Sequence, residues 1–193
     1  MHGNLVSLRP LVVEDAKTLW TQIGNDPDTW QWVGSGAPMP RSAEDLATEF
    51  SRQINRQDSE YFAIVDLSTQ TVIGSSAFLD IRPIDRHFEI GSTFIAPGFR
   101  GGNRNIEAKL LMLTEAFEVR DAVRVTLKAN GQNTRSRAAI EKIGAKFEGL
   151  LRNQRLERDG SWRNAAYYSV ILEDWPSTKQ KLLDLLDDGG NLA

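Results

Sequence analysis

Residues 94–109 read FIAPGFRGGNRNIEAK, and this stretch predicts a strand, then a loop rich in glycine and arginine, then a helix. The first N–H groups of a helix lack intrahelical partners and lie at the positive end of the helix dipole, so such a junction binds anions. Gly101 and Gly102 let the backbone approach an anion, and Arg100 and Arg104 offer donors shaped for phosphate oxygens. The stretch therefore predicts a phosphate site, with a tight turn and solvated arginines as the alternative.

Two common phosphate loops do not match this segment. A Walker loop needs Lys followed by Ser or Thr after its second glycine, and the dinucleotide fingerprint needs a different glycine spacing. An enzyme that handles nucleotide phosphates with this loop stays open as an alternative, although the sequence offers no evident pair of magnesium ligands.

The composition is that of an ordinary globular chain. With 193 residues, 40% of them hydrophobic and 25% charged, we expect one domain spanning residues 1–193. A net charge of −3 gives no support for a nucleic-acid partner. No apolar run approaches the roughly 18 residues of a membrane span, and Arg9, Glu14 and Asp15 interrupt any signal-like segment, so no membrane partner is expected.

Cysteine and histidine usage narrows the chemistry. The chain contains no cysteine, which excludes disulfides, thiolate catalysis and cysteine-bound metals and fits a cytoplasmic location. The two histidines, His2 and His87, cannot form a helical zinc-binding pair beside a carboxylate. We therefore expect no metal site.

Hydrophobic periodicity and turn residues predict the order of the elements. The expected strands are 5–8, 61–67, 71–79, 87–95, 123–128, 146–157 and 161–172; the expected helices are 13–25, 42–55, 106–119, 133–143 and one from Pro176, with a loop or broken helix at 26–41 and a frayed tail at 187–193. Antiparallel strands come first and a strand–helix–strand unit follows. The predicted class is therefore α+β, or layered α/β, with a mixed sheet.

Residues 100–105, RGGNRN, resemble the acyl-coenzyme A (acyl-CoA) motif Gln/Arg-x-x-Gly-x-Gly/Ala of the GNAT acetyltransferase superfamily. Arg100 matches the first position, and Asn103 and Asn105 stand at the fourth and sixth. Asparagine tolerates left-handed backbone, so we expect the loop still to close with asparagine at these two positions. Residues 133–149, NTRSRAAIEKIGAKFEG, are similar to the following motif of the RimJ/RimL-like branch, which acts on ribosomal-protein N-termini. The resemblance covers residues 5–176.

This resemblance implies a fold and a set of ligand contacts. The fold is a mixed, mostly antiparallel sheet with helices on both faces and a V-shaped splay between two strands. The pantetheine arm pairs with the backbone of Thr93, Phe94 and Ile95. The other residues implied in binding acetyl-CoA are Arg100, Gly101, Gly102, Asn103, Arg104, Asn105, Asn133 and Ser136.

Acetyl transfer needs a base for the amine and an acid for the departing thiolate. Glu89, on the strand that enters the splay, is the candidate base, with a salt-bridged strand residue as the alternative. The resemblance implies Ser136 and Tyr168 as the candidate acids; helix capping and core packing are their alternatives. The assignment of the base stays open at this point.

The predicted function is acetyl-CoA-dependent transfer of an acetyl group to a primary amine, by direct attack in a ternary complex. The amine belongs to a protein N-terminus or a small molecule, and monomer and homodimer are both open. The alternative is a catalytically inactive acyl-CoA-binding or regulatory module. Trp30 and Trp32 are expected in the acceptor pocket or the core. Lysines 109, 142 and 146 are expected to be solvated, or else to meet the adenosine 3′-phosphate.

Overall fold

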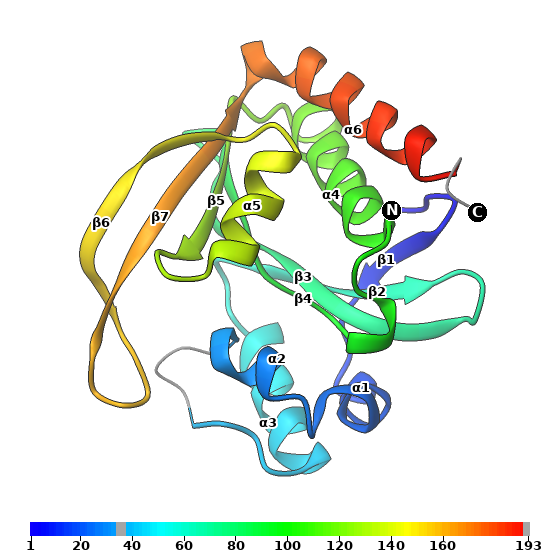
Figure 1. Ribbon diagram of the computed structural model, residues 1–193, viewed down its shortest axis with the longest axis vertical. Helices are drawn as coiled ribbons and strands as arrows, with labels where there is room; N and C mark the ends of the chain where they lie inside the picture. Colours follow the sequence, from blue (N-terminus) through cyan, green and yellow to red (C-terminus); the bar gives the residue numbers. More distant parts are fainter. Residues whose placement is uncertain (34–37, 191–193) are drawn as a thin grey trace.

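The computed structural model describes residues 1–33 and 38–190 (Figure 1). In these ranges seven strands form one sheet in the order β1-β2-β3-β4-β5-β7-β6. The strands are β1 (Val6–Pro10), β2 (Glu60–Asp66), β3 (Thr71–Arg82), β4 (His87–Ile95), β5 (Arg124–Asn130), β6 (Lys146–Leu156) and β7 (Trp162–Ile171). The β4–β5 pair is parallel and the other neighbours are antiparallel, which confirms the predicted mixed, mostly antiparallel sheet.

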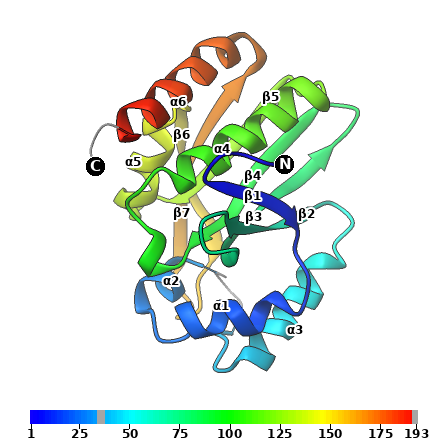
Figure 2. The same cartoon turned by 90° about the vertical axis from the view of Figure 1, so that its right-hand side faces the viewer.

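Helices cover both faces of the sheet, as Figures 1 and 2 show. One face carries α1 (Asp15–Ile23), α2 (Pro27–Trp32) and α3 (Ala43–Ile54), and the other carries α4 (Arg104–Thr114), α5 (Thr134–Lys142) and α6 (Trp175–Gly190). Each face has its own buried apolar cluster, so the sheet is the middle of three layers. None of the helices in the described ranges is long and apolar enough to cross a membrane.

Local signals placed several helix ends correctly. The Ser42 hydroxyl accepts a hydrogen bond from the Asp45 N–H at 3.2 Å and caps α3, as its position predicted. Within the 26–41 segment Asp26 caps α2, so this part is helical, while residues 34–37 lie outside the described ranges. Helix α6 continues through Gly190, into the stretch expected to be a tail.

The helix expected at 106–119 is longer and less regular than predicted. α4 begins at Arg104, and its last turn, η2 (Glu115–Val119), is a π-helix. This wider turn contains Phe117, which is 4% exposed and stacks on Trp175 with ring centroids 5.2 Å apart. The contact connects the end of the α4 segment to the start of α6.

Glu107 fastens the edge of the sheet to α4. Its buried carboxylate accepts hydrogen bonds from the backbone N–H groups of Asn4, Leu5 and Val6 at 2.8, 2.7 and 2.7 Å. These N–H groups precede or open β1, and an unpaired buried N–H is costly. The position of α4 over β1 therefore depends on this carboxylate.

We predict that Glu107→Ala lowers the free energy of unfolding by about 3 kcal/mol or more, because three N–H groups lose their acceptor at once. Urea denaturation followed by tryptophan fluorescence measures this change. Asp187→Ala, which removes an exposed carboxylate from α6, is the matched control and should cost less than about 0.5 kcal/mol. Equal losses for the two variants would contradict the proposed anchoring role.

Candidate active site

β4 and β5 separate partway along their length. They pair in parallel from His87–Arg124 to Ile90–Leu127, and beyond that point the described residues of the two strands do not pair with each other. A cavity of about 330 Å³ lies at the opening. Its walls come from the second half of β4, the start of α4 and the loop before it, α5, β5 and α2. The predicted V-shaped splay is thus present, and it is hollow.

A β-bulge lies where the strands separate. On β3, Ser75 pairs with Phe94 and Ala77 pairs with Gly91, so Ser76 alone faces two residues of β4. One of these, Ser92, has a left-handed φ of 49°. Bulges of this kind redirect side chains and are frequent beside active sites.

Gly74 allows β3 and β4 to approach closely beside this bulge. A Cβ atom at this position would lie 2.1 Å from the Phe94 carbonyl oxygen, which no side chain tolerates. Phe94 and Ile95, both predicted ligand contacts, line the cavity on this part of β4.

The two arginines of the loop already have carboxylate partners. Arg100 donates to the Asp26 carboxylate at 2.5 Å, to the Thr29 hydroxyl at 2.6 Å and, through Nε, to the Ile95 carbonyl at 2.8 Å. Arg104 donates to Asp66 at 2.5 Å and is not among the residues that line the cavity. Arg100 does line the cavity, but both side chains primarily fix the loop to its neighbours.

The Arg104 partner is almost fully buried. Asp66 is 1% exposed, and its burial acts to raise the pKa of the carboxyl group. Hydrogen bonds from Ser68, Arg104 and Thr69 outweigh that effect and lower the pKa of Asp66 to about 2. Asp66 is therefore ionised at neutral pH and holds the first residue of α4 against β2.

The backbone of the loop remains directed at the cavity. Gly101, Gly102 and Asn105 line it, and Gly101 has a left-handed φ of 83°. The left-handed position is therefore Gly101, whereas Asn103 has a φ of −75°. Asn103 donates instead to the Leu186 carbonyl of α6 at 3.2 Å. Within the described part of the chain, the buried Asn105 Oδ1 has no hydrogen-bond partner.

The start of α5 forms the opposite wall. Asn133 caps this helix, because its Oδ1 accepts a hydrogen bond from the Ser136 N–H at 3.0 Å. Both residues line the cavity, and their predicted contact with acetyl-CoA stays a prediction. Capping and ligand contact are compatible for Asn133, and capping leaves the Ser136 hydroxyl free of that role.

The candidate base and the second candidate acid lie outside the cavity lining. Glu89 forms an ion pair with Lys128 at 2.6 Å, and it is Lys128 that reaches the cavity. Burial acts to lower the pKa of Lys128, but Glu89 and Tyr167 outweigh it, so the pKa is raised. Tyr168 is fully buried, and its hydroxyl accepts from Arg137 at 2.9 Å and donates to Glu141 at 2.8 Å. The structure thus places Ser136 in the lining of the cavity, whereas Tyr168 lies outside it with its hydroxyl bonded to Arg137 and Glu141.

Two other expectations are resolved by packing. Trp30 is a core residue whose indole N–H donates to the Ile23 carbonyl at 2.8 Å, whereas Trp32 lines the cavity. Lys109 was expected to be solvated, and that expectation was wrong, because it is 6% exposed and lines the cavity. Its spacing from Met112 and Leu113 puts it on the apolar stripe of α4, which is the signal that could have revealed its burial.

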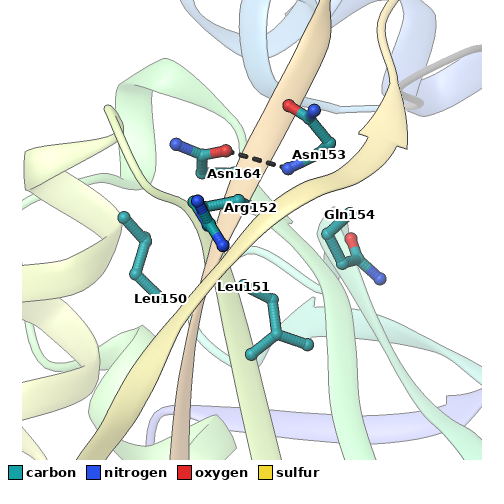
Figure 3. A pocket seen from close by; sticks show the side chains of 6 residues that line it. All are labelled: Leu150, Leu151, Arg152, Asn153, Gln154 and Asn164. Carbon is teal, nitrogen blue, oxygen red and sulfur yellow. Dashed lines mark hydrogen bonds between the residues drawn. The ribbon is translucent and has the colours of Figure 1, made fainter.

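A second, larger hollow of about 820 Å³ lies on the outer hairpin, beside a bulge in β6 (Figure 3). Leu150, Leu151, Arg152, Asn153, Gln154 and Asn164 line it. Its walls are the edge strand β6 and the neighbouring strand β7. The Asn153 N–H of β6 donates a hydrogen bond to Asn164 Oδ1 of β7 at 2.9 Å. It contains none of the predicted site residues, so the smaller cavity in the splay is the candidate active site.

Comparison with known proteins agrees with this geometry. The acetyltransferase (GNAT) domain family matches residues 6–146. YdaF of Bacillus subtilis (strain 168), named "Putative ribosomal N-acetyltransferase", is 31% identical over 177 residues, covering 90% of this chain and 95% of YdaF. A GCN5-related N-acetyltransferase from Brucella melitensis has a TM-score of 0.87 at 26% identity, covering 96% of this chain and 84% of that chain.

A further similar structure contains a CoA derivative. RimJ of Mycobacterium smegmatis, solved in complex with CoA-disulfide, has a TM-score of 0.79 at 23% identity, covering 93% of this chain and 88% of that chain. At that identity the likeness concerns the fold alone. The predicted resemblance to the GNAT superfamily is confirmed, and the similarity to YdaF agrees with the predicted RimJ/RimL-like branch. The matched domain, the relatives and the splayed sheet together show that this chain belongs to the GNAT N-acetyltransferase family.

Proposed function

We propose that the chain transfers an acetyl group from acetyl-CoA to a primary amine, by direct attack within a ternary complex. The observation that carries this proposal is the separation of β4 from β5 over a cavity of about 330 Å³. Backbone groups that face such a gap lack strand partners, so an extended amide-bearing arm can pair with them as an added strand. The pantetheine arm of CoA has that chemistry.

The loop and the two helix starts fit the rest of the acyl donor. Gly101 and Gly102 line the cavity next to the first turn of α4, where backbone N–H groups favour a pyrophosphate. The buried Asn105 Oδ1 offers an acceptor that a donor group of the ligand can satisfy. Phe94, Ile95, Asn133 and Ser136 complete the contacts that we assign to acetyl-CoA.

We assign the proton transfers to two side chains, Glu89 next to the cavity lining and Ser136 within it. The amine must arrive uncharged, and we assign its proton to the Glu89 carboxylate, reached through water beside Lys128. The amine nitrogen then forms a bond to the thioester carbon, and the carbon–sulfur bond breaks. We assign the hydrogen bond to the leaving sulfur to the Ser136 hydroxyl rather than to Tyr168, because Ser136 lines the cavity. The chain contains no cysteine, so it cannot form an acyl-enzyme intermediate on a thiol. This favours direct attack of the amine on the thioester.

The acceptor enters, on this proposal, from the side of α2. That wall presents Trp32, Val33 and the Asp28 carboxylate, a surface suited to a chain segment that ends in an ammonium group. The name of the relative YdaF, which refers to ribosomal N-acetylation, supports a protein N-terminus as the acceptor. The second possible acceptor is a small-molecule amine. A screen of peptides and small amines as acceptors distinguishes the two.

Binding of acetyl-CoA should depend on the conformation of Gly101. We predict that the wild-type chain binds acetyl-CoA and not ATP in calorimetric titrations. Gly101→Ala should weaken that binding by about tenfold or more, because its φ of 83° disfavours any side chain and the loop must shift.

Gly160→Ala is the matched control for this measurement. Gly160 has the same φ of 83° and the same open surroundings, but it lies in the turn between β6 and β7. Its replacement should cost similar stability and leave acetyl-CoA binding unchanged. Equal affinity of the wild-type chain for ATP and acetyl-CoA would instead favour the nucleotide-phosphate alternative.

Turnover should depend on the Glu89 carboxylate. We predict that Glu89→Gln lowers kcat by about 10²-fold or more, with little change in affinity for acetyl-CoA, because the amine loses its proton acceptor. The assay uses a peptide with a free N-terminus, and the same peptide with a blocked N-terminus should not react. Glu49→Gln, which removes the carboxylate of an ion pair with Arg52 on α3, should leave kcat unchanged. An unaltered kcat in Glu89→Gln would remove this residue from the mechanism.

A further inference from the structure

Lys109 is a buried amine at the bottom of the splay. It extends from α4 toward the bulge in β4, where its Nζ donates to the Thr93 hydroxyl at 2.6 Å and to the Ser76 hydroxyl at 3.1 Å. The residue is 6% exposed and belongs to the lining of the cavity. At the bulge Ser76 faces two residues of β4, and Thr93 is one of them. The amine is therefore fixed at the point where the strands separate.

Among the charged side chains around the cavity, Lys109 is distinguished by its lack of a carboxylate. Three other cations line the cavity and each has an acidic partner: Arg100 with Asp26, Lys128 with Glu89, and Arg135 with Asp28. Within the described ranges Lys109 has only hydroxyl partners. The positive charge of Lys109 is thus available to an anion inside the cavity, whereas the charges of the three other cations are compensated by carboxylates.

The fold has no evident need for this amine. The Ser76 and Thr93 hydroxyls lie 2.7 Å apart and hydrogen-bond to each other without it. Burial of an ammonium group without a counter-charge is costly, and here it lowers the pKa of Lys109 to about 7. An unpaired amine in this place destabilises the folded chain, which points to a role in the reaction rather than in stability.

We propose that Lys109, as an ammonium group, stabilises the thiolate of CoA as the thioester breaks; this rests on the proposed function. When the amine of the acceptor forms its bond to the carbonyl carbon, the carbon–sulfur bond breaks and the sulfur keeps the electron pair. Its negative charge then faces the ammonium group of Lys109, while the Ser136 hydroxyl donates a hydrogen bond. The amine releases one proton to Glu89, and the sulfur finally takes up one proton to give the CoA thiol, so no net proton is gained or lost.

The direct test measures the ionisation of the CoA thiol in the binary complex. Thiolate absorbance in the ultraviolet, followed against pH with CoA bound, gives the pKa of that thiol. The expected pKa is lower in the wild-type chain than in Lys109→Met by about one unit or more, because a cation within a few ångströms favours the thiolate. Lys17→Met, which replaces an exposed lysine on α1, should give the wild-type value.

Stability supplies a second readout. Between pH 7 and 10.5 the unfolded chain holds a proton on Lys109 that the folded chain releases, so this residue makes stability rise with pH. Lys109→Met should therefore raise the melting temperature most at or below pH 7, with the gain shrinking toward pH 10.5. A lower melting temperature in Lys109→Met would show a structural role and contradict the proposal.

A second uncharged variant separates the loss of the charge from any misfolding of Lys109→Met. Lys109→Gln keeps a hydrogen-bond donor for Thr93 but carries no charge, so it should show the same raised thiol pKa as Lys109→Met. Normal CoA binding with equal thiol pKa values in the wild-type chain and both variants would overturn the role of Lys109 alone. Failure of the wild-type chain to bind CoA would overturn the proposed function as well.

Discussion

The separation of β4 from β5 after Ile90 and Leu127 is the constraint on which the rest of the site depends. A parallel pair that continued to Ile95 would leave neither the cavity nor unpaired backbone on β4. The bulge opposite Ser76 accompanies this separation, and the absence of a side chain at Gly74 lets β3 hold the departing half of β4 from its other edge. One edge of β4 thus pairs with β3 on both sides of the bulge, while beyond Ile90 the other edge is open to a ligand.

Ion pairs around the cavity hold the loop and the helix starts in place and compensate the charge of most of the cations there. Arg100 connects the loop to α2 through Asp26, and Arg104 connects the start of α4 to β2 through Asp66. Because these guanidinium groups are occupied, we propose that the loop binds an anion through its backbone N–H groups and the helix dipole. Among the cavity-lining cations of the described residues, Lys109 is the one without a carboxylate partner, and its burial strengthens its effect on a neighbouring charge.

Local signals predicted the elements well. Alternation identified β4 with its correct ends, His87 and Ile95, and the capping residues Ser42 and Asn133 marked the starts of α3 and α5. These features depend on neighbours within a few residues, which is why the sequence alone suffices for them. The motif resemblance supplied the splay and placed Gly101, Gly102, Asn105 and Ser136 around it.

Partnerships between distant residues could not be predicted in this way. The pairing of Arg100 with Asp26 joins residues 74 positions apart, and nothing in either segment indicates it. Tyr168 was a reasonable acid by its strand position, but its hydroxyl is occupied by Arg137 and Glu141 from α5. Lys109 was misassigned because a lone lysine on an apolar stripe is usually solvated, and only the packed bulge provides the hydroxyls that make its burial tolerable.

Amide hydrogen exchange on β4 tests the central claim most directly. The N–H groups of His87 to Ile90 belong to the part already paired with β5, whereas those from Gly91 to Ile95 lie beside the gap. If the pantetheine arm pairs with β4 as an added strand, acetyl-CoA should slow exchange in residues 91–95, and ATP should not. Unchanged exchange in residues 91–95 at saturating acetyl-CoA would contradict the account.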